Sequence, residues 1–170
     1  MQFEQTALSR EMQRAIQDMG FTEMTEVQEK TIPEMMEGKD AIAKAPTGTG
    51  KTCAFGVPII ERIDGESDAL QCLILAPTRE LTSQITEDMR AMAKYKEGLR
   101  IVSVYGGQSM QRQLEPLKKK PQIIVATPGR LLDHIKRKTV KLHALKTVVL
   151  DEADEMLDMG FIKDVTNILD

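Results

Sequence analysis

A short glycine-rich segment that ends in a lysine and a threonine carries the clearest chemical signal in the sequence. The segment is Ala45-Pro46-Thr47-Gly48-Thr49-Gly50-Lys51-Thr52. Gly48 and Gly50 allow the backbone to turn with its N–H groups facing inward, and a helix beginning near Gly50 would point its positive dipole end at the same place. Lys51 offers a cation to the outer phosphates of a nucleotide, and Thr52 offers a hydroxyl to Mg²⁺. The segment therefore predicts a nucleotide-phosphate site, although Ala45 stands where the general pattern has glycine.

A run of acidic residues supplies the second chemical signal. Asp151-Glu152-Ala153-Asp154 directly follows the apolar residues 148–150. A carboxylate at the end of a strand beside a phosphate loop is the usual second holder of Mg²⁺, which makes Asp151 a candidate metal ligand together with Thr52. Glu152 is then the candidate base that orients or deprotonates the attacking water. Acidic residues also favour the first turn of a helix, where they meet its dipole. Their occurrence together with the phosphate loop favours the catalytic interpretation.

Short apolar runs, each followed by a longer amphipathic stretch, must position these groups. The runs are residues 41–43, 72–75, 101–104, 123–125 and 148–150. Apolar strands that alternate with helices indicate βαβ units, and hence an α/β fold with a parallel sheet and helices on both faces. Ligands of such sheets bind at the carboxyl ends of the strands. Both chemical signals lie at positions of this kind.

Two helices are expected ahead of the first run. Ser9 and Thr25 are the expected N-caps of these helices, and Gly20 and Gly38 are their expected ends. The chain contains no internal repeat or linker, and its length suits one domain. We therefore expect a single domain over residues 1–170, with a helical segment at 1–38 and the phosphate-loop core at 39–170.

Composition and charge limit the classes of function. The chain is 41% hydrophobic and 29% charged, and its net charge of −3 argues against holding nucleic acid by bulk electrostatics. The lysine-rich runs at 118–120 and 136–138 are expected to be solvated helix faces. Cys53 and Cys72 do not form a disulfide framework and are expected to be buried thiols. No apolar run is long enough to span a membrane and no signal peptide is evident, so we expect a cytoplasmic location.

Taken in order, the segments resemble the first RecA-like domain of the DEAD-box RNA helicases. Residues 151–154 match the tetrad that names this family, and residues 45–52 match its phosphate loop, which also carries alanine first. Further matches are Pro77-Thr78-Arg79-Glu80-Leu81, Gly106-Gly107 and Thr127-Pro128-Gly129-Arg130. The resemblance extends from Phe3 to the end of the chain. It implies part of an RNA-dependent ATPase that uses ATP and Mg²⁺ and couples ATP hydrolysis to local unwinding or remodelling of RNA duplexes.

The resemblance also implies an adenine-binding segment near the N-terminus. Phe3, Gly20-Phe21, Thr25 and Gln28 resemble this segment of the family, in which the glutamine contacts the adenine edge and the upstream aromatic ring packs on the base. That assignment would make the nucleotide ATP rather than GTP. Thr25 and Gln28 also have the spacing of a capping box, in which the glutamine bonds back to the N-cap. The two roles compete for one amide group, and the spacing of Phe3 favours adenine contact.

The loops after three of the predicted strands are implied RNA-backbone contacts. They comprise Pro77, Thr78, Arg79, Gly106, Gly107, Thr127, Pro128, Gly129 and Arg130. Thr127 can cap a helix with Pro128 at its first position, and paired glycines let the backbone approach a sugar–phosphate chain. Such contacts would be independent of RNA sequence and would neutralise few phosphates. For Arg79 and Arg130, an internal ion pair is an equally good expectation.

No Ser-Ala-Thr segment follows the acidic tetrad, although the family carries one on its next strand. We therefore expect a sheet that lacks its last strand, with an exposed edge that lowers stability or promotes self-association. The second RecA-like domain is also expected to be absent, and with it the family's arginine fingers. The resemblance implies that Asp154 takes part in the coupling between the two domains. The 170-residue chain is then expected to bind ATP or ADP weakly, to hydrolyse ATP very slowly and not to unwind RNA.

Two other functions fit parts of the pattern. One is a related helicase that acts on DNA, against which Asp154 and the adenine-binding segment argue. The other is an RNA clamp with a vestigial ATPase, which would have no use for Glu152.

Overall fold

The structure is a computed structural model, and it describes residues 2–38, 50–158, 160, 163 and 168. The predicted strand at 41–43 and the predicted phosphate-loop residues Ala45, Thr47, Gly48 and Thr49 lie outside these residues. The chain divides into two compact units, which are Met1–Gly65 with Glu87–Leu99 and Glu66–Thr86 with Arg100–Asp170. These bounds differ from the predicted division at residue 38, and the predicted single domain remains an expectation.

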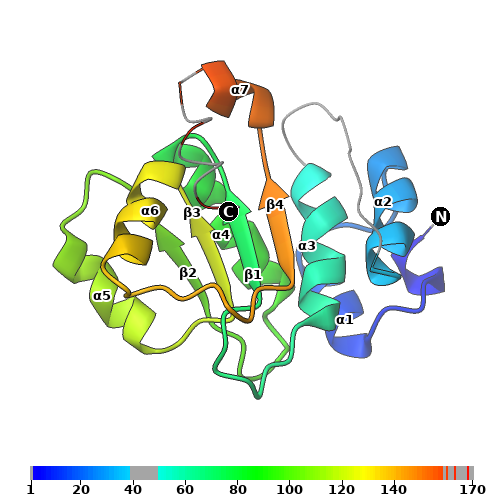
Figure 1. Ribbon diagram of the computed structural model, residues 1–170. Helices are drawn as coiled ribbons and strands as arrows, with labels where there is room; N and C mark the ends of the chain where they lie inside the picture. The colour runs from blue at the N-terminus through cyan, green and yellow to red at the C-terminus, as the bar shows by residue number, and fades with distance from the viewer. Residues whose placement is uncertain (1, 39–49, 159, 161–162, 164–167, 169–170) are drawn as a thin grey trace. The chain divides into compact units, whose positions relative to one another are not determined.

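The first unit is helical. It contains the short helix η1 (Phe3–Gln5), α1 (Arg10–Asp18), α2 (Glu26–Met36), α3 (Lys51–Arg62) and the end of α4 (Arg79–Met92). Helices α2 and α3 lie side by side (Figure 1). Helix α3 is buried along most of its length, from Cys53 to Ile60. The first unit therefore packs around the helix that follows the phosphate loop.

The predicted helix ends in the first unit are confirmed. Ser9 accepts a hydrogen bond from the backbone N–H of Met12 at 3.1 Å and also donates through its hydroxyl to Glu61, which ties α1 to α3. Gly20 and Gly38 follow the ends of α1 and α2 and adopt φ angles of +86° and +82°. Glycine adopts this left-handed conformation at no steric cost, so it stops a helix there.

The second unit contains a four-stranded parallel sheet (Figure 1). The strands are β1 (Cys72–Leu75), β2 (Ile101–Val104), β3 (Ile123–Ala126) and β4 (Thr147–Leu150), in the spatial order β2-β3-β1-β4. The helices of this unit are α5 (Met110–Lys118), α6 (Pro128–Lys136) and α7 (Ala153–Asp158). The four predicted strands that fall on described residues are confirmed, as is the α/β fold with its parallel sheet.

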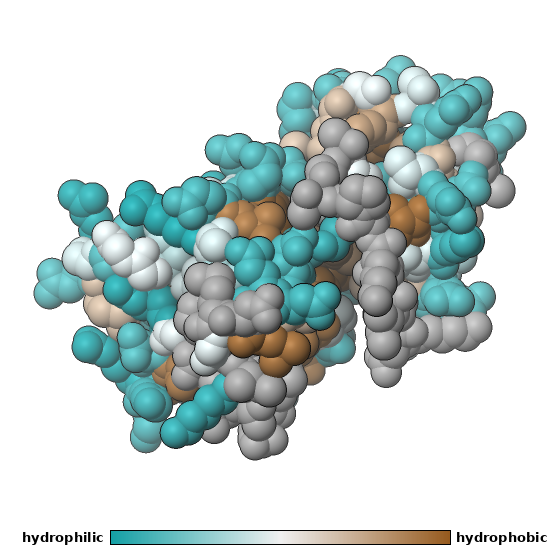
Figure 2. Space-filling view, turned by 90° about the horizontal axis from the view of Figure 1, so that it is seen from above, coloured by the Kyte–Doolittle hydropathy of each residue, from teal (hydrophilic) through white to brown (hydrophobic). Residues whose placement is uncertain are grey.

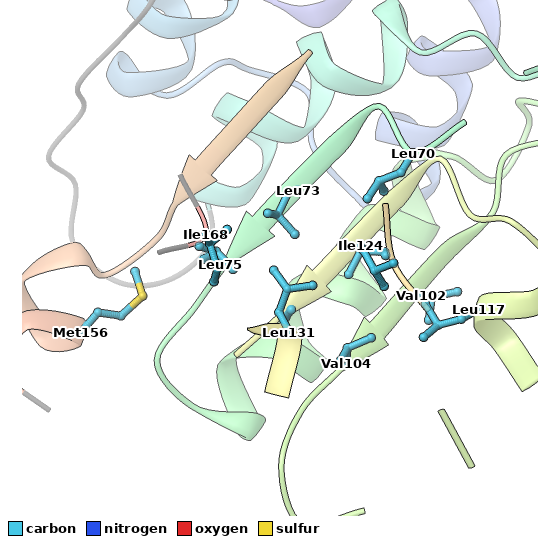
Figure 3. Packing of buried hydrophobic residues seen from close by; sticks show 12 residues of the cluster. Leu70, Leu73, Leu75, Val102, Val104, Leu117, Ile124, Leu131, Met156 and Ile168 are labelled. Carbon is cyan, nitrogen blue, oxygen red and sulfur yellow. The ribbon is translucent and has the colours of Figure 1, made fainter. Parts of the chain in front are cut away.

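The sheet is buried on both faces along its centre. Side chains alternate between the two faces of a strand, and all four residues of β1 and of β3 are buried. Figure 3 shows one of the two faces, where Leu73, Leu75 and Ile124 pack with Leu131 of α6. Burial on both faces explains why these strands are continuous apolar runs in the sequence rather than alternating ones.

Strand β4 is an exception to this burial. It lies at one end of the strand order, and Val148 and Leu150 keep 36% and 40% of their surface exposed. The apolar run at 148–150 suggests a buried strand, but these two side chains are not buried. Among the described residues, only β1 pairs with β4, so that one of its edges is not paired within this sheet.

The visible surface agrees with the composition. Figure 2 shows hydrophilic side chains over most of the coloured surface in that view, with small hydrophobic patches between them. Within the described part of the chain, no helix combines the length and the apolar character that a membrane span requires.

Candidate functional site

The start of α3 places the last residues of the phosphate loop. Gly50 is the N-cap of α3, and Lys51 and Thr52 form its first turn, as predicted. A β-carbon at Gly50 would lie 2.9 Å from Oγ1 of Thr25 and 3.0 Å from its Cγ2, which is closer than such contacts occur. Only glycine therefore fits between the N-terminus of α2 and the N-terminus of α3. The backbone N–H groups at the start of a helix and its dipole make this end of α3 suitable for an anion.

Gln28 joins the two helix N-termini. Its Oε1 accepts a hydrogen bond from the backbone N–H of Thr25 at 2.9 Å, and its Nε2 donates to the carbonyl of Gly50 at 3.0 Å. The Gln28 side chain is buried, with 1% of the residue's surface exposed. The backbone N–H of Gln28 in turn donates to Oγ1 of Thr25, so the capping box is formed. An amide nitrogen carries two hydrogens, and the contact with Gly50 uses one of them.

The aromatic residues of the predicted adenine site lie in the same unit. Phe3 is buried, and its backbone N–H donates to the carbonyl of Thr22 at 3.1 Å, which fixes η1 against the segment before α2. Phe21 is partly buried, and its backbone N–H donates to the carbonyl of Ile16. The structure thus places Phe3 and Gln28 in one unit. Only 3% of the surface of Phe3 is exposed, so a base could pack on this ring only if η1 shifted.

The carboxyl ends of the four strands bring the remaining predicted residues together in the second unit. The last residues of the strands pair in register, Val104 with Ala126, Ala126 with Leu75, and Leu75 with Leu150. The loops that follow them therefore begin side by side at one edge of the sheet. These loops hold Pro77-Thr78-Arg79, Gly106-Gly107, Thr127-Pro128-Gly129-Arg130 and Asp151-Glu152-Ala153-Asp154.

The acidic residues differ in burial and backbone geometry. Asp151 is buried, and its backbone N–H donates to the carbonyl of Leu75 at 2.9 Å. Glu152 is partly buried and adopts φ +54°, in the left-handed region that costs a residue with a side chain about 1 kcal/mol or more. Asp154 is exposed in the first turn of α7.

Thr127 and Pro128 begin α6 as predicted. Thr127 is the N-cap, and Pro128 occupies the first turn. The hydroxyl of Thr127 makes no capping hydrogen bond. The start of α6 is therefore a helix N-terminus whose first N–H groups are not capped by the Thr127 side chain, next to the loop of Gly106 and Gly107.

Arg79, for which an ion pair and an RNA contact were both expected, lies against an aromatic ring. Its guanidinium carbon is 5.1 Å from the centroid of the Tyr105 ring, a cation–π distance. Tyr105 directly precedes Gly106-Gly107, and its hydroxyl accepts a hydrogen bond from Nε2 of Gln108 at 3.1 Å. Gly107 adopts φ +90°, which favours glycine at this turn. Arg79, from the loop after β1, therefore packs on Tyr105, which begins the loop after β2.

Arg130 also makes internal contacts, and they are hydrogen bonds to neutral groups. Its Nη1 donates to the carbonyl of Gln108 at 2.8 Å and lies 3.4 Å from Oε1 of Gln113. Gln113 was not among the predicted site residues. Its only sequence signal is its place one turn into an amphipathic stretch, where a glutamine is ordinarily solvent-facing.

The metal-binding potential of the described residues is small. No cluster of three or more histidine, cysteine or acidic side chains that could hold an ion occurs among them. The predicted Mg²⁺ ligands are one hydroxyl, from Thr52, and one carboxylate, from Asp151. This donor set fits Mg²⁺, since that ion usually takes one or two protein oxygens and completes its shell with nucleotide phosphates and water.

Comparisons with known proteins agree with these motifs. A family model described as DEAD/DEAH box helicase matches residues 25–170. The ATP-dependent RNA helicase CshA of Listeria monocytogenes is 53% identical over 98% of this chain, which corresponds to 32% of that protein. The DEAD-box ATP-dependent RNA helicase CshA of Geobacillus kaustophilus is 51% identical over 98% of this chain and 36% of that protein. The chain thus spans about a third of the length of these curated relatives.

Two solved structures have the same fold. A crystal structure of a DEAD box protein from Methanococcus jannaschii matches 99% of this chain and 46% of its own, with a TM-score of 0.92 and 43% identity. A hypothetical ATP-dependent RNA helicase from Sulfolobus tokodaii matches 95% of this chain and 46% of its own, with a TM-score of 0.87 and 41% identity.

Proposed function

The chain belongs to the DEAD/DEAH box helicase family, and on that premise we propose that it is the ATP-binding part of an RNA-dependent ATPase. The full-length protein would couple ATP hydrolysis to local unwinding or remodelling of RNA duplexes. The observation that carries the proposal is the register of β1 to β4. Because the four strands end level with one another, the acidic segment and the three loops with candidate RNA contacts begin side by side. Open α/β sheets bind their ligands at this edge.

The phosphate loop and the acidic residues after β4 would bind the nucleotide and act on it. Lys51 would neutralise the outer phosphates, and the N-terminus of α3 would receive them through its backbone N–H groups. Thr52 and Asp151 would hold Mg²⁺, which neutralises the charge that develops on the transferred phosphoryl group. Glu152 would orient the attacking water and accept its proton. Ala45, Thr47, Gly48, Thr49 and Gly50 would complete the phosphate loop.

Gln28 would select adenine. Its position against Gly50 supports this assignment, because it puts the amide next to the residue that begins the phosphate-binding helix. The second hydrogen on Nε2 and the second lone pair on Oε1 are the groups that an adenine edge requires. Thr25 would hold the glutamine through the capping box. Phe21 would supply apolar surface for the base, and Phe3 would do so after a shift of η1.

The second unit would hold RNA through its backbone. The candidate donor at the start of α6, where Thr127 is the N-cap and Pro128 carries no N–H, is the backbone N–H of Gly129. Further candidate contacts are the loop of Gly106 and Gly107, with Pro77 and Thr78 at the start of α4. Phosphate contacts of this kind position RNA without reading its sequence. They also suit a chain with a net charge of −3, since a helix N-terminus binds phosphate without a cationic side chain.

The remaining assignments concern the rest of the protein. We propose a second RecA-like domain as the partner that Asp154 contacts, and a cytoplasmic location. Within the described residues β4 pairs along one edge only, which supports self-association of the isolated 170-residue chain, since exposed strand edges pair with other chains. Alone, the chain would bind ATP or ADP weakly and would not unwind RNA.

The test is the ATPase activity of the full-length protein with RNA and with DNA of the same sequence. We expect RNA to accelerate hydrolysis and DNA not to, and GTP to be a poor substrate. Glu152→Gln should lower kcat by about a hundredfold or more while nucleotide binding is retained, because it removes the base and keeps the shape. Glu155→Gln makes the same chemical change one turn along α7 at an exposed side chain and should have no effect. Equal stimulation by DNA, or equal loss in both variants, would contradict the proposal.

A further inference from the structure

One buried glutamine contacts two of the loops proposed to bind RNA. Gln113 lies on α5 with 2% of its surface exposed. Its Nε2 donates to the carbonyl of Tyr105 at 2.6 Å, directly before Gly106. Its Oε1 lies 3.4 Å from Nη1 of Arg130, directly after Gly129. The two loops are therefore joined through the two ends of one amide group.

The orientation of this amide follows from its partners. A carbonyl only accepts and a guanidinium only donates, so the NH₂ end must face Tyr105 and the oxygen must face Arg130. The same oxygen lies 2.8 Å from Nε2 of His134, which must then carry a hydrogen. In a neutral ring, Nδ1 then carries no hydrogen, and the single hydrogen of the Thr139 hydroxyl has two acceptors within reach, Nδ1 at 2.8 Å and the carbonyl of His134 at 3.0 Å. The partners of Gln113 thus fix the orientation of its amide and place a hydrogen on Nε2 of His134.

Further contacts extend this arrangement around the Gly106–Gly107 loop. Arg130 donates to the carbonyl of Gln108, and Gln108 donates to the hydroxyl of Tyr105. The guanidinium of Arg79 packs on the Tyr105 ring. The residues on both sides of the paired glycines are therefore fixed, while a β-carbon at Gly106 would meet no atom within 4 Å. The loop is held at its ends and is open at its first glycine.

We propose that Gln113 is a positioning residue for RNA binding, which sets the loop of Gly106 and Gly107 relative to the N-terminus of α6. The inference rests on the proposed function. A binding site made of backbone N–H groups gains little from long-range attraction, so its affinity depends on the direction in which each N–H points. Without Gln113, the carbonyl of Tyr105 and the ring of His134 would lose their buried partner, and both loops would adopt other conformations.

Gln122 provides a matched control. It is also buried in the second unit and also joins separate segments, since its Oε1 accepts from the backbone N–H of Arg100 and its Nε2 donates to the carbonyl of Ser67. It lies directly before β3, at the end of the strand opposite to Thr127. Gln122→Leu should lower stability as Gln113→Leu does, without changing the loops proposed to bind RNA.

The experiment compares Gln113→Leu and Gln122→Leu in the full-length protein by RNA-stimulated ATPase activity and thermal unfolding. We expect Gln113→Leu to raise the KM for RNA about tenfold and to leave the KM for ATP within about twofold, as for the loss of a positioned hydrogen-bond network. Gln122→Leu should lower the Tm by a similar amount with an unchanged KM for RNA. The salt dependence of RNA affinity should keep its slope in Gln113→Leu, because no charge is removed.

The outcomes separate the inference from the proposed function. Wild-type protein without RNA-dependent activity would overturn both. Wild-type protein that responds to RNA, with an unchanged KM for RNA in Gln113→Leu or an equal rise in Gln122→Leu, would overturn the inference alone. If Gln113→Leu does not fold, Gln113→Asn serves instead. Its shorter amide cannot reach Tyr105 and Arg130 together, and the same rise in the KM for RNA is expected.

Discussion

Gly56 offers a direct test of how α3 is packed. It lies in the buried part of this helix, where Met89 and Met92 of α4 contact it within the first unit. A β-carbon at Gly56 would lie 2.6 Å from Cε of Met92 and 2.8 Å from Sδ of Met89. Both methionines are buried almost completely, so their ends have little room to move. Gly56→Ala would place a methyl group against both methionines.

The expected size of the effect is a balance of two terms. Alanine is favoured over glycine in a helix interior by about 1 kcal/mol. Forcing an extra methyl group into a filled core costs about 1–3 kcal/mol. Because two contacts fall below 3.0 Å, we expect the steric cost to exceed the propensity gain. Gly56→Ala should therefore lower the free energy of unfolding by about 1 kcal/mol.

A double-mutant cycle with Met92→Ala separates the two terms. Met92→Ala alone should cost about 2–5 kcal/mol, because it leaves a cavity. In the double mutant the new methyl group enters that cavity, so the sum of the single effects should exceed the double effect by about 1 kcal/mol or more. Urea unfolding followed by circular dichroism measures all four proteins. Stabilisation by Gly56→Ala alone, together with additive effects in the cycle, would refute the reasoning.

Two further predictions concern buried titratable groups. Burial, with the guanidinium groups of Arg130 and Arg137, lowers the pKa of His134 below its ordinary value of 6.5, so the unfolded chain binds the proton more tightly. The contribution of the neutral His134 to the free energy of unfolding is fully present above pH 6.5 and decreases as the pH falls below that value. His134→Gln should flatten the pH dependence of Tm between about pH 7 and pH 5, and an unchanged dependence would contradict this. Burial also raises the pKa of the Cys53 thiol to about 12 and raises that of the chain's other cysteine, so a thiol reagent at pH 8 should label both only after urea is added. Rapid labelling of the folded chain would contradict it.

The elements of the fold were predictable because their signals are local. The predicted runs 72–75 and 101–104 coincide with β1 and β2, and those at 123–125 and 148–150 differ from β3 and β4 by one residue at one end. Ser9 and Thr25 act as N-caps because the bond they form lies within one turn of helix. The exposure of Val148 and Leu150 was not predictable, since it depends on the position of β4 in the strand order and not on the residues of the strand itself.

The positions of the site residues were predictable, and many of their contacts were not. A parallel sheet brings all strand ends to one edge, so the loops that contain Gly106 and Thr127 had to lie near each other. The partners of Arg130 come from the turn before α5 and from α5 itself. The geometry of that turn has no signature in the sequence, so an ion pair and an RNA contact were equally good expectations. The same limit applies to Gln28, whose capping bond was evident from spacing while its bond to Gly50 spans 22 residues.

The internal contacts of the arginines bear on how a chain with a net charge of −3 could bind RNA, as we propose. A guanidinium that packs on Tyr105, or that donates to the carbonyl of Gln108, keeps its charge but fixes its own position. Arg79 and Arg130 can then lend positive potential to the edge of the sheet without each pairing with a phosphate. Binding would come mainly from oriented backbone N–H groups, which do not require the release of many counterions. On this reasoning Gln113, which carries no charge, matters to RNA affinity because it decides where those N–H groups point.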